Sequence, residues 1–211
     1  MEQRWITFDC YGTLLDWQSA FRRILEPVAD GRIEALVHAF HVVEPEVQRD
    51  LPTASYKDIL RECLARAAPE VDRNLLVDGW HTVEPFADTP AALAALHAAG
   101  WKLGILTNCD NDLFEATRAA LGEPIDLVVT AEETRSYKPA LGHFEAFEAR
   151  TGVARASWVH AAVSWYHDMV PAQELGLRRV WVDREHSGHD ASIVTAHIHD
   201  MASLPATVAA L

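Results

Sequence analysis

The chain alternates between two patterns of hydrophobic and polar positions. Short apolar runs, which are typical of buried strands, occur at residues 5–8, 102–106, 126–130, 158–163 and 179–182. Apolar residues recur at helical spacing near residues 89–99, 112–121, 142–151 and 170–175. Strands that alternate with helices in this way predict right-handed crossovers, and therefore a parallel sheet covered by helices on both faces.

Residues 16–83 differ from the rest, because they show helical periodicity and contain no convincing strand. The clearest helical stretches are 34–40 and 56–67, and four prolines are expected to interrupt the helices: Pro27, Pro45, Pro52 and Pro69. We therefore expect an α/β fold with a Rossmann-like parallel sheet core formed by residues 1–15 and 84–211. Residues 16–83 would be a helical cap inserted after the first strand.

A few residues predict where helices begin and end. Thr89 is a plausible N-cap, Pro90 suits the first helical position, and Gly100 is expected to stop that helix. Asp110 is a candidate cap for the helix near residues 112–121.

Polar residues follow four of the predicted strands. Asp9 comes directly after the first strand, Thr107 and Asn108 follow the second, Lys138 lies in the loop after the third, and Asp168 comes shortly after the fourth. Parallel α/β sheets bind their ligands at the edge formed by the carboxyl ends of the strands. We therefore expect these side chains to converge on one site.

Composition and charge narrow the classes of partner. The chain has 211 residues, of which 49% are hydrophobic, and this is enough for one substantial core. Its net charge of −13 argues against binding to nucleic acid or to an anionic membrane, so a small anionic substrate would need a local cationic group. The three cysteines show no metal-binding spacing, and with no signal peptide or long apolar span the expected location is cytoplasmic.

The stretch FDCYGTLLD at residues 8–16, followed by TN at 107–108, KP at 138–139 and the late Asp168, resembles the haloacid dehalogenase superfamily. Phosphatases of that superfamily carry D-x-D-x-T, whose second carboxylate protonates the departing alkoxide. This chain has Tyr11 at that position, as the 2-haloacid dehalogenases do. Halide leaves without a proton, so the resemblance implies halide release from a short 2-haloacid, with no metal and no cofactor.

The resemblance also implies a role for each polar residue. Asp9 would attack the carbon that bears the halogen and form an ester, which water then hydrolyses. Lys138 would keep Asp9 ionised, and Asp168 would position or activate the water. Thr13 would hydrogen-bond the Asp9 carboxylate.

A second group of residues would contact the substrate. The resemblance implies that Thr107 bonds the Asp9 or substrate carboxylate and that Asn108 cradles the departing halide. Tyr11 and Ser164 complete the predicted substrate-binding set. The arginine that would bind the substrate from the cap has four candidates: Arg22, Arg23, Arg49 and Arg61.

The sequence departs from the dehalogenase pattern at Phe144, Val163 and Trp165, where dehalogenases carry polar side chains. Two other functions therefore stay open: a magnesium-dependent phosphatase acting on a small phosphate ester, and a catalytically impaired relative. Asp9 and Asp168 alone form a poor Mg²⁺ site, because Val163 replaces a further carboxylate.

The C-terminal region contains four histidines close together in the sequence. The histidine-rich tail lacks an evident carboxylate or cysteine partner, so a polar loop is favoured over a metal site there; its members are His186, His189, His197 and His199. Pairing of two chains into a homodimer stays open.

Overall fold

The computed structural model describes residues 3–211 and contains a six-stranded parallel sheet, so the predicted α/β fold is confirmed. The strand order is β3-β2-β1-β4-β5-β6. The strands are β1 (Trp5–Phe8), β2 (Lys102–Thr107), β3 (Leu127–Thr130), β4 (Trp158–Ala162), β5 (Arg178–Val182) and β6 (Ala196–Ile198).

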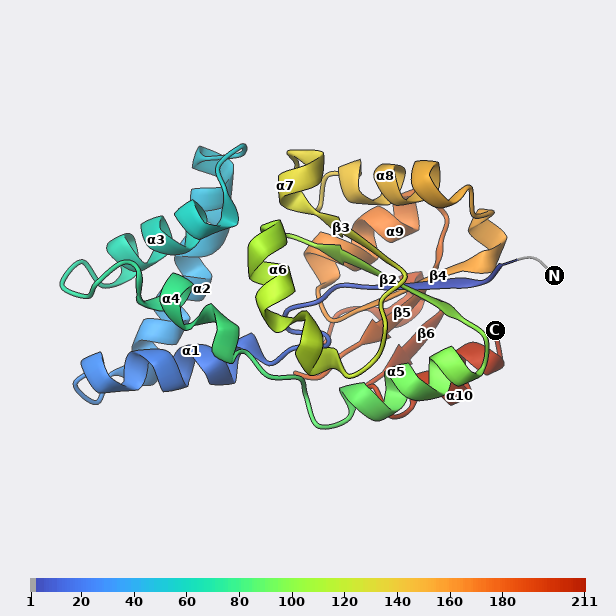
Figure 1. Ribbon diagram of the computed structural model, residues 1–211, viewed down its shortest axis with the longest axis horizontal. Coiled ribbons are helices and arrows are strands. Elements are labelled where there is room, and N and C mark those ends of the chain that lie inside the picture. The colour runs from blue at the N-terminus through green and yellow to red at the C-terminus, as the bar shows by residue number, and fades with distance from the viewer. Residues whose placement is uncertain (1–2) are drawn as a thin grey trace.

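Helices cover both faces of this sheet, which explains why its strands are continuous apolar runs rather than alternating ones. All residues of β1 and β4 are buried. In Figure 1, α5 and α10 lie below the sheet, and α8 and α9 lie above it. The helices that accompany the sheet are α5 (Thr89–Ala98), α6 (Asn111–Arg118), α7 (Ala131–Thr134), α8 (Gly142–Thr151), α9 (Val170–Glu174) and α10 (Leu204–Ala209). Shorter turns are η3 (Ala119–Leu121), η4 (Arg155–Ser157), η5 (Trp165–Met169) and η6 (Ala191–Ile193).

The strand order creates a place for a ligand beside β1. The chain moves from β1 to β2 and β3 on one side, and β4 to β6 lie on the other side. In sheets of this order, ligands bind at the carboxyl ends of the strands where the direction of the chain reverses. Asp9 directly follows β1, so it lies at this position.

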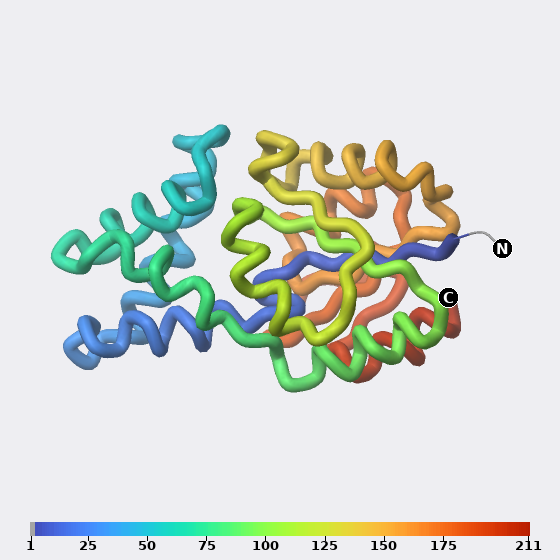
Figure 2. The backbone as a smooth tube through the Cα atoms, in the orientation of Figure 1, coloured from blue at the N-terminus to red at the C-terminus, as the bar shows by residue number. Residues whose placement is uncertain are grey.

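Residues 16–83 form a separate group of helices beyond the carboxyl edge of the sheet. Figures 1 and 2 show this group at the end of the molecule opposite the N-terminus. Its elements are α1 (Trp17–Leu25), η1 (Glu26–Val28), α2 (Ile33–Asp50), α3 (Tyr56–Ala67), α4 (Leu75–Gly79) and η2 (Trp80–Thr82). Phe21, Phe40 and Trp80 are buried within it, and Phe21 contacts the other two rings.

Two antiparallel connections join this group to the sheet. The Asp16 N–H donates to the Glu84 carbonyl at 2.8 Å, and the Phe86 N–H donates to the Leu14 carbonyl at 3.0 Å. These two hydrogen bonds therefore link the segment where the chain leaves the sheet to the segment where it returns.

Several predicted helix boundaries were wrong. Pro45 does not interrupt its helix, because α2 continues through it to Asp50 with Pro45 on the exposed side. Thr89 is the first residue of α5 rather than its cap, and its hydroxyl donates to the Leu14 carbonyl at 3.0 Å. Asp110 precedes α6, but its carboxylate accepts the backbone N–H groups of Tyr56 and Lys57 instead and so caps α3.

The C-terminal region is more regular than expected. β6 and α10 were not predicted, because a three-residue strand and a six-residue helix give too short a pattern. No helix within residues 3–211 is long and apolar enough to cross a membrane.

Candidate active site

Asp9, Thr13, Lys138 and Asp168 converge at the carboxyl edge of the sheet. The Lys138 Nζ donates to Asp9 Oδ1 at 2.9 Å and to Asp168 Oδ1 at 2.7 Å. The Thr13 hydroxyl donates to Asp9 Oδ2 at 3.0 Å. Each oxygen of the Asp9 carboxylate thus has one donor, which fixes the orientation of the group.

A tight turn after β1 returns Thr13 to Asp9. Gly12 has a φ of +95°, a conformation that glycine adopts at little cost, and its N–H donates to the Leu15 carbonyl at 2.7 Å. The Thr13 hydroxyl also accepts the Val163 N–H at 3.0 Å, which links this turn to the loop after β4.

Asn108 holds the loop that carries Lys138. Its Oδ1 accepts the Lys138 N–H at 2.7 Å, and its Nδ2 donates to the Lys138 carbonyl at 3.0 Å. The third donor of the Lys138 ammonium group goes to the Leu106 carbonyl at 2.8 Å. The amide of Asn108 is therefore engaged in positioning Lys138, and its predicted contact with halide stays a prediction.

A buried chain of hydrogen bonds supports Asp168 from within the sheet. The Trp158 Nε1–H donates to the Thr7 Oγ1 at 2.8 Å, Thr7 Oγ1 lies 2.8 Å from His160 Nδ1, and His160 Nε2 lies 3.0 Å from Asp168 Oδ1. Because the ionised Asp168 carboxylate can only accept, the imidazole donates to it from Nε2, while Thr7 Oγ1 accepts the indole N–H and hydrogen-bonds to His160 Nδ1. His160 was not predicted as a site residue from the sequence. A histidine within the apolar run of β4, two residues from Trp158 on the same face, was the available signal.

Burial and the lysine shift the protonation of the two carboxyl groups in opposite directions. Burial raises the pKa of Asp168, but Lys138 and His160 outweigh it and lower the pKa to about 2. Burial raises the pKa of Asp9, and the attraction of Lys138 opposes that shift in part. Burial alone would lower the pKa of Lys138, but the two carboxylates raise it, so this ammonium group stays charged.

The predicted substrate-binding residues line the cavity beside Asp9, but some of their polar atoms are already engaged. Tyr11 turns its hydroxyl away from Asp9, to Thr117 at 2.8 Å and to the Trp80 Nε1–H at 3.0 Å. The Thr107 hydroxyl donates to Cys109 rather than to Asp9, contrary to one of its two predicted roles. The Ser164 hydroxyl accepts the His167 N–H and caps η5.

A cavity of about 590 Å³ opens between the sheet and the helices of residues 16–83. Asp9, Lys138 and Asp168 line it from the sheet, whereas Trp17, His41, Glu44 and Tyr56 are among the residues that line it from the helices. This volume suits a small organic molecule.

Among the four candidate arginines, Arg22 alone lines the cavity with Asp9. Arg22 forms a bidentate ion pair with Glu34 at 2.8 and 3.0 Å. Both side chains are exposed, and exposed ion pairs contribute little stability, so a ligand can compete for the guanidinium. Arg184 also lines the cavity, but it is held by Asp88 and by the Thr13 carbonyl.

The three departures from the dehalogenase pattern have different surroundings. Phe144 is buried against Trp158 and His160 and does not line the cavity. Val163 and Trp165 line it and supply no polar side chain there. The buried Asp168 Oδ2 has no hydrogen-bond partner within residues 3–211.

The fit of this site to a magnesium ion is poor. Lys138 Nζ is bound to an oxygen of both Asp9 and Asp168, between the carboxylates that a dication would use. Val163 offers no further ligand, whereas Mg²⁺ demands near-octahedral oxygen coordination.

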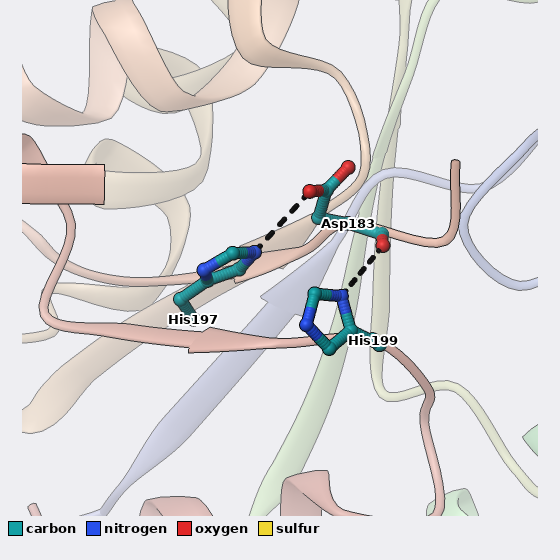
Figure 3. A group of neighbouring side chains, drawn as sticks. All are labelled: Asp183, His197 and His199. Carbon is teal, nitrogen blue, oxygen red and sulfur yellow. Dashed lines mark hydrogen bonds and ion pairs between the residues drawn. The ribbon is translucent and has the colours of Figure 1, made fainter. Parts of the chain in front are cut away.

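The histidine-rich tail does have a carboxylate partner, contrary to the sequence analysis. Figure 3 shows Asp183, which follows β5, beside His197 and His199. The signal was hidden because the partner lies fourteen residues before His197 and only the pairing of β5 with β6 brings them together.

Comparison of the sequence with known proteins identifies one family. Residues 3–160 match the family model of the haloacid dehalogenase-like hydrolases. The chain is 25% identical over 198 residues to the (S)-2-haloacid dehalogenase of Pseudomonas putida, covering 88% of this chain and 86% of that protein. It is 24% identical over 196 residues to the (S)-2-haloacid dehalogenase of Pseudomonas fluorescens, covering 87% and 86%.

Solved structures share the whole fold. The L-2-haloacid dehalogenase of Xanthobacter autotrophicus, solved with chloropropionic acid covalently bound, superposes with a TM-score of 0.84 at 21% identity and covers 99% of each chain. The family model spans well over half of the sequence and includes Asp9, Thr13, Thr107 and Lys138. The chain therefore belongs to the haloacid dehalogenase-like hydrolases.

Proposed function

We propose that this hydrolase releases halide from short (S)-2-haloalkanoic acids through an ester of Asp9. The observation that carries the proposal is the position of Tyr11, which stands two residues after the nucleophile and turns its hydroxyl to Thr117 and Trp80. No acid is thereby presented to a departing alkoxide from this position, and halide needs none. The names of the curated relatives support the same substrate class.

In the first step, an oxygen of the Asp9 carboxylate attacks C2 of the substrate in line with the carbon–halogen bond. The new C–O bond forms as the C–X bond breaks, and the halide leaves with the bonding electrons. Lys138 and Thr13 hold the carboxylate in place at 2.9 and 3.0 Å, so little reorganisation is required for attack.

In the second step, water attacks the carbonyl carbon of the Asp9 ester. Asp168 accepts a proton from this water through Oδ2, the oxygen that Lys138 and His160 leave free. The Lys138 ammonium stabilises the negative charge that develops on the ester oxygen. The tetrahedral intermediate then expels the 2-hydroxyacid oxygen, which takes up the proton held by Asp168. Asp9 emerges as the carboxylic acid and returns to the carboxylate by releasing the second water proton to solvent. The water oxygen stays in the Asp9 carboxylate.

We also propose that residues 16–83 act as a cap over Asp9, with Arg22 binding the substrate carboxylate. The cavity is lined by both parts of the chain, and a lid that excludes water would protect the first step from competing hydrolysis. A cytoplasmic location is supported by three unpaired, buried cysteines. A homodimer stays a prediction.

Two assays test the proposed function. The protein is incubated with (S)- and with (R)-2-chloropropanoate and, separately, with an aryl phosphate, each with and without excess chelator. We expect chloride release from the (S) enantiomer that survives the chelator. Magnesium-dependent phosphate release without any chloride would replace this proposal with the phosphatase.

A further inference from the structure

We infer that Asp183, His197 and His199 bind one divalent transition-metal ion of the zinc type at the end of β5 and β6. Imidazole nitrogen and carboxylate oxygen are the ligands that zinc takes when thiolates are not present. One ligand atom from each of the three residues lies within 4.8 Å of the others. Water would occupy the fourth coordination position.

The sheet places the three residues together. Trp181 pairs with His197 and Val182 with Ile198, and the Asp183 N–H donates to the Ile198 carbonyl at 2.7 Å. Because side chains two residues apart in a strand point to the same face, His197 and His199 both face Asp183 (Figure 3).

Each group is oriented by a neighbour outside the cluster or by the backbone. The His197 ring stacks on the buried Trp181, with ring centroids 4.4 Å apart and planes 13° from parallel. Asp183 Oδ1 accepts the Ser187 N–H at 2.9 Å, and His199 Nδ1 lies 3.0 Å from the Asp183 carbonyl oxygen. Bonds of this kind from the surroundings are typical of residues that bind metals in proteins.

The distance between the two best-fixed ligand atoms matches a tetrahedral zinc site. Asp183 Oδ2 and His197 Nε2 are 3.3 Å apart, which is long for a hydrogen bond. Two ligands at ~2.0–2.1 Å from zinc with a tetrahedral angle are separated by ~3.3 Å. The ligand atom of the exposed His199 lies within 4.8 Å of the other two, so it must approach by at most ~1.5 Å to reach this separation.

An ion at this position would stabilise the edge of the sheet. β6 has three residues and is the last strand in the order, so few hydrogen bonds hold it. The next residue after Asp183 is Arg184, whose guanidinium donates to the Thr13 carbonyl at 3.1 Å. The ion would therefore also help to order the segment that contacts the turn beside Asp9. It takes no part in the proposed hydrolysis.

The test uses tag-free protein that has been stripped with chelator and titrated with Zn²⁺ by calorimetry. We expect one equivalent to bind, and the double variant His197→Gln/His199→Gln to bind at least ~100-fold more weakly. At a zinc concentration of about 100 times Kd, binding stabilises the folded protein by about 2.7 kcal/mol, so the melting temperature of the wild type should rise by about 5–11 °C, and that of the double variant should change little.

The matched control is His97→Gln. His97 lies 2.9 Å from Glu123 in an exposed histidine–carboxylate pair that lacks a second histidine ligand. This variant should bind zinc as the wild type does. Absence of stoichiometric binding, or equal loss of binding in His97→Gln, would overturn the inference. Zinc binding and the melting temperature are both measured without turnover, so their results are independent of whether the dehalogenase proposal is correct.

Discussion

Replacing Lys138 with methionine should both destabilise the protein and abolish most of its activity. The Lys138 side chain is only 1% exposed, and it separates Asp9 from Asp168, whose side chains are 14% and 0% exposed. Methionine fills a similar volume but leaves two nearby carboxylates without their shared cation. Removing one partner from a buried ion pair costs about 3–5 kcal/mol of the free energy of unfolding.

This cost should lower the melting temperature at pH 8 by roughly 10 °C, since 1 kcal/mol corresponds to about 2–4 °C in a chain of this size. One of the two carboxyl groups should then have its pKa raised above its unfolded value, so the variant takes up a proton on folding. Its deficit should therefore shrink as the pH falls from 8 towards 4. Turnover should fall at least ~10²-fold.

The matched control is Lys102→Met. Lys102 forms a 2.6 Å ion pair with Asp126, but its side chain is 45% exposed. Such a pair contributes at most about 1 kcal/mol, so this variant should melt within a few degrees of the wild type at every pH. Thermal melts of both variants from pH 4 to 8 make the comparison. Equal deficits for the two variants, with the same pH dependence, would refute the role given to Lys138.

Three further substitutions test the roles of Asp168 and Arg22 and the protonation of His143, a buried residue of α8 whose Nε2 lies 3.1 Å from the Thr107 carbonyl oxygen. In rapid-quench assays, Asp168→Asn should release a burst of about one halide per protein and then turn over slowly. The reason is that the Asp9 ester still forms, but the water that hydrolyses it has no base to accept its proton. Steady turnover without a burst would contradict this role of Asp168. Arg22→Gln should lower kcat/KM about 10–100-fold, mainly by raising KM. Arg23→Gln should leave kcat/KM unchanged, because the Arg23 guanidinium donates to the Thr82 carbonyl instead. Equal effects of the two substitutions on kcat/KM would exclude Arg22 as the ligand of the substrate carboxylate. Burial lowers the pKa of His143 to about 3, so the folded protein resists protonation there and stability is lost as the pH falls from about 6.5 towards 3. The free energy of unfolding, measured by urea melts, should fall by about 2–3 kcal/mol less between pH 7.5 and pH 4.5 in His143→Gln than in the wild type. The same pH dependence in both proteins would show that His143 is not the source of this loss of stability.

The parallel sheet could be predicted because most of its buried strands are continuous apolar runs bounded by turns. The same reasoning failed where the pattern is short or depends on contacts distant in sequence. β6 spans three residues, and Pro45 lies within α2 because tertiary packing maintains that helix beyond its local preference.

The converging residues of the site could be predicted from strand ends, but their exact partners could not. The motif places Asp9, Lys138 and Asp168 at one edge, and the structure brings them into contact. His160 supports Asp168 from inside β4, and Asp183 meets His197 across β5 and β6. Pairings of this kind arise from strand register, which a single sequence does not specify.

In the proposed reaction Asp9 forms a covalent ester with the substrate, and isotope labelling tests this step most directly. The protein turns over (S)-2-chloropropanoate in H₂¹⁸O, and mass spectrometry then measures the peptide that contains Asp9. We expect ¹⁸O in the Asp9 carboxylate after turnover, and unlabelled hydroxyl oxygen in the product of a single turnover with excess enzyme. Asp9→Asn protein, incubated and digested in the same way, should show neither product nor label. Label in the product of that single turnover, with none in Asp9, would show that water attacks the substrate directly and would contradict the account.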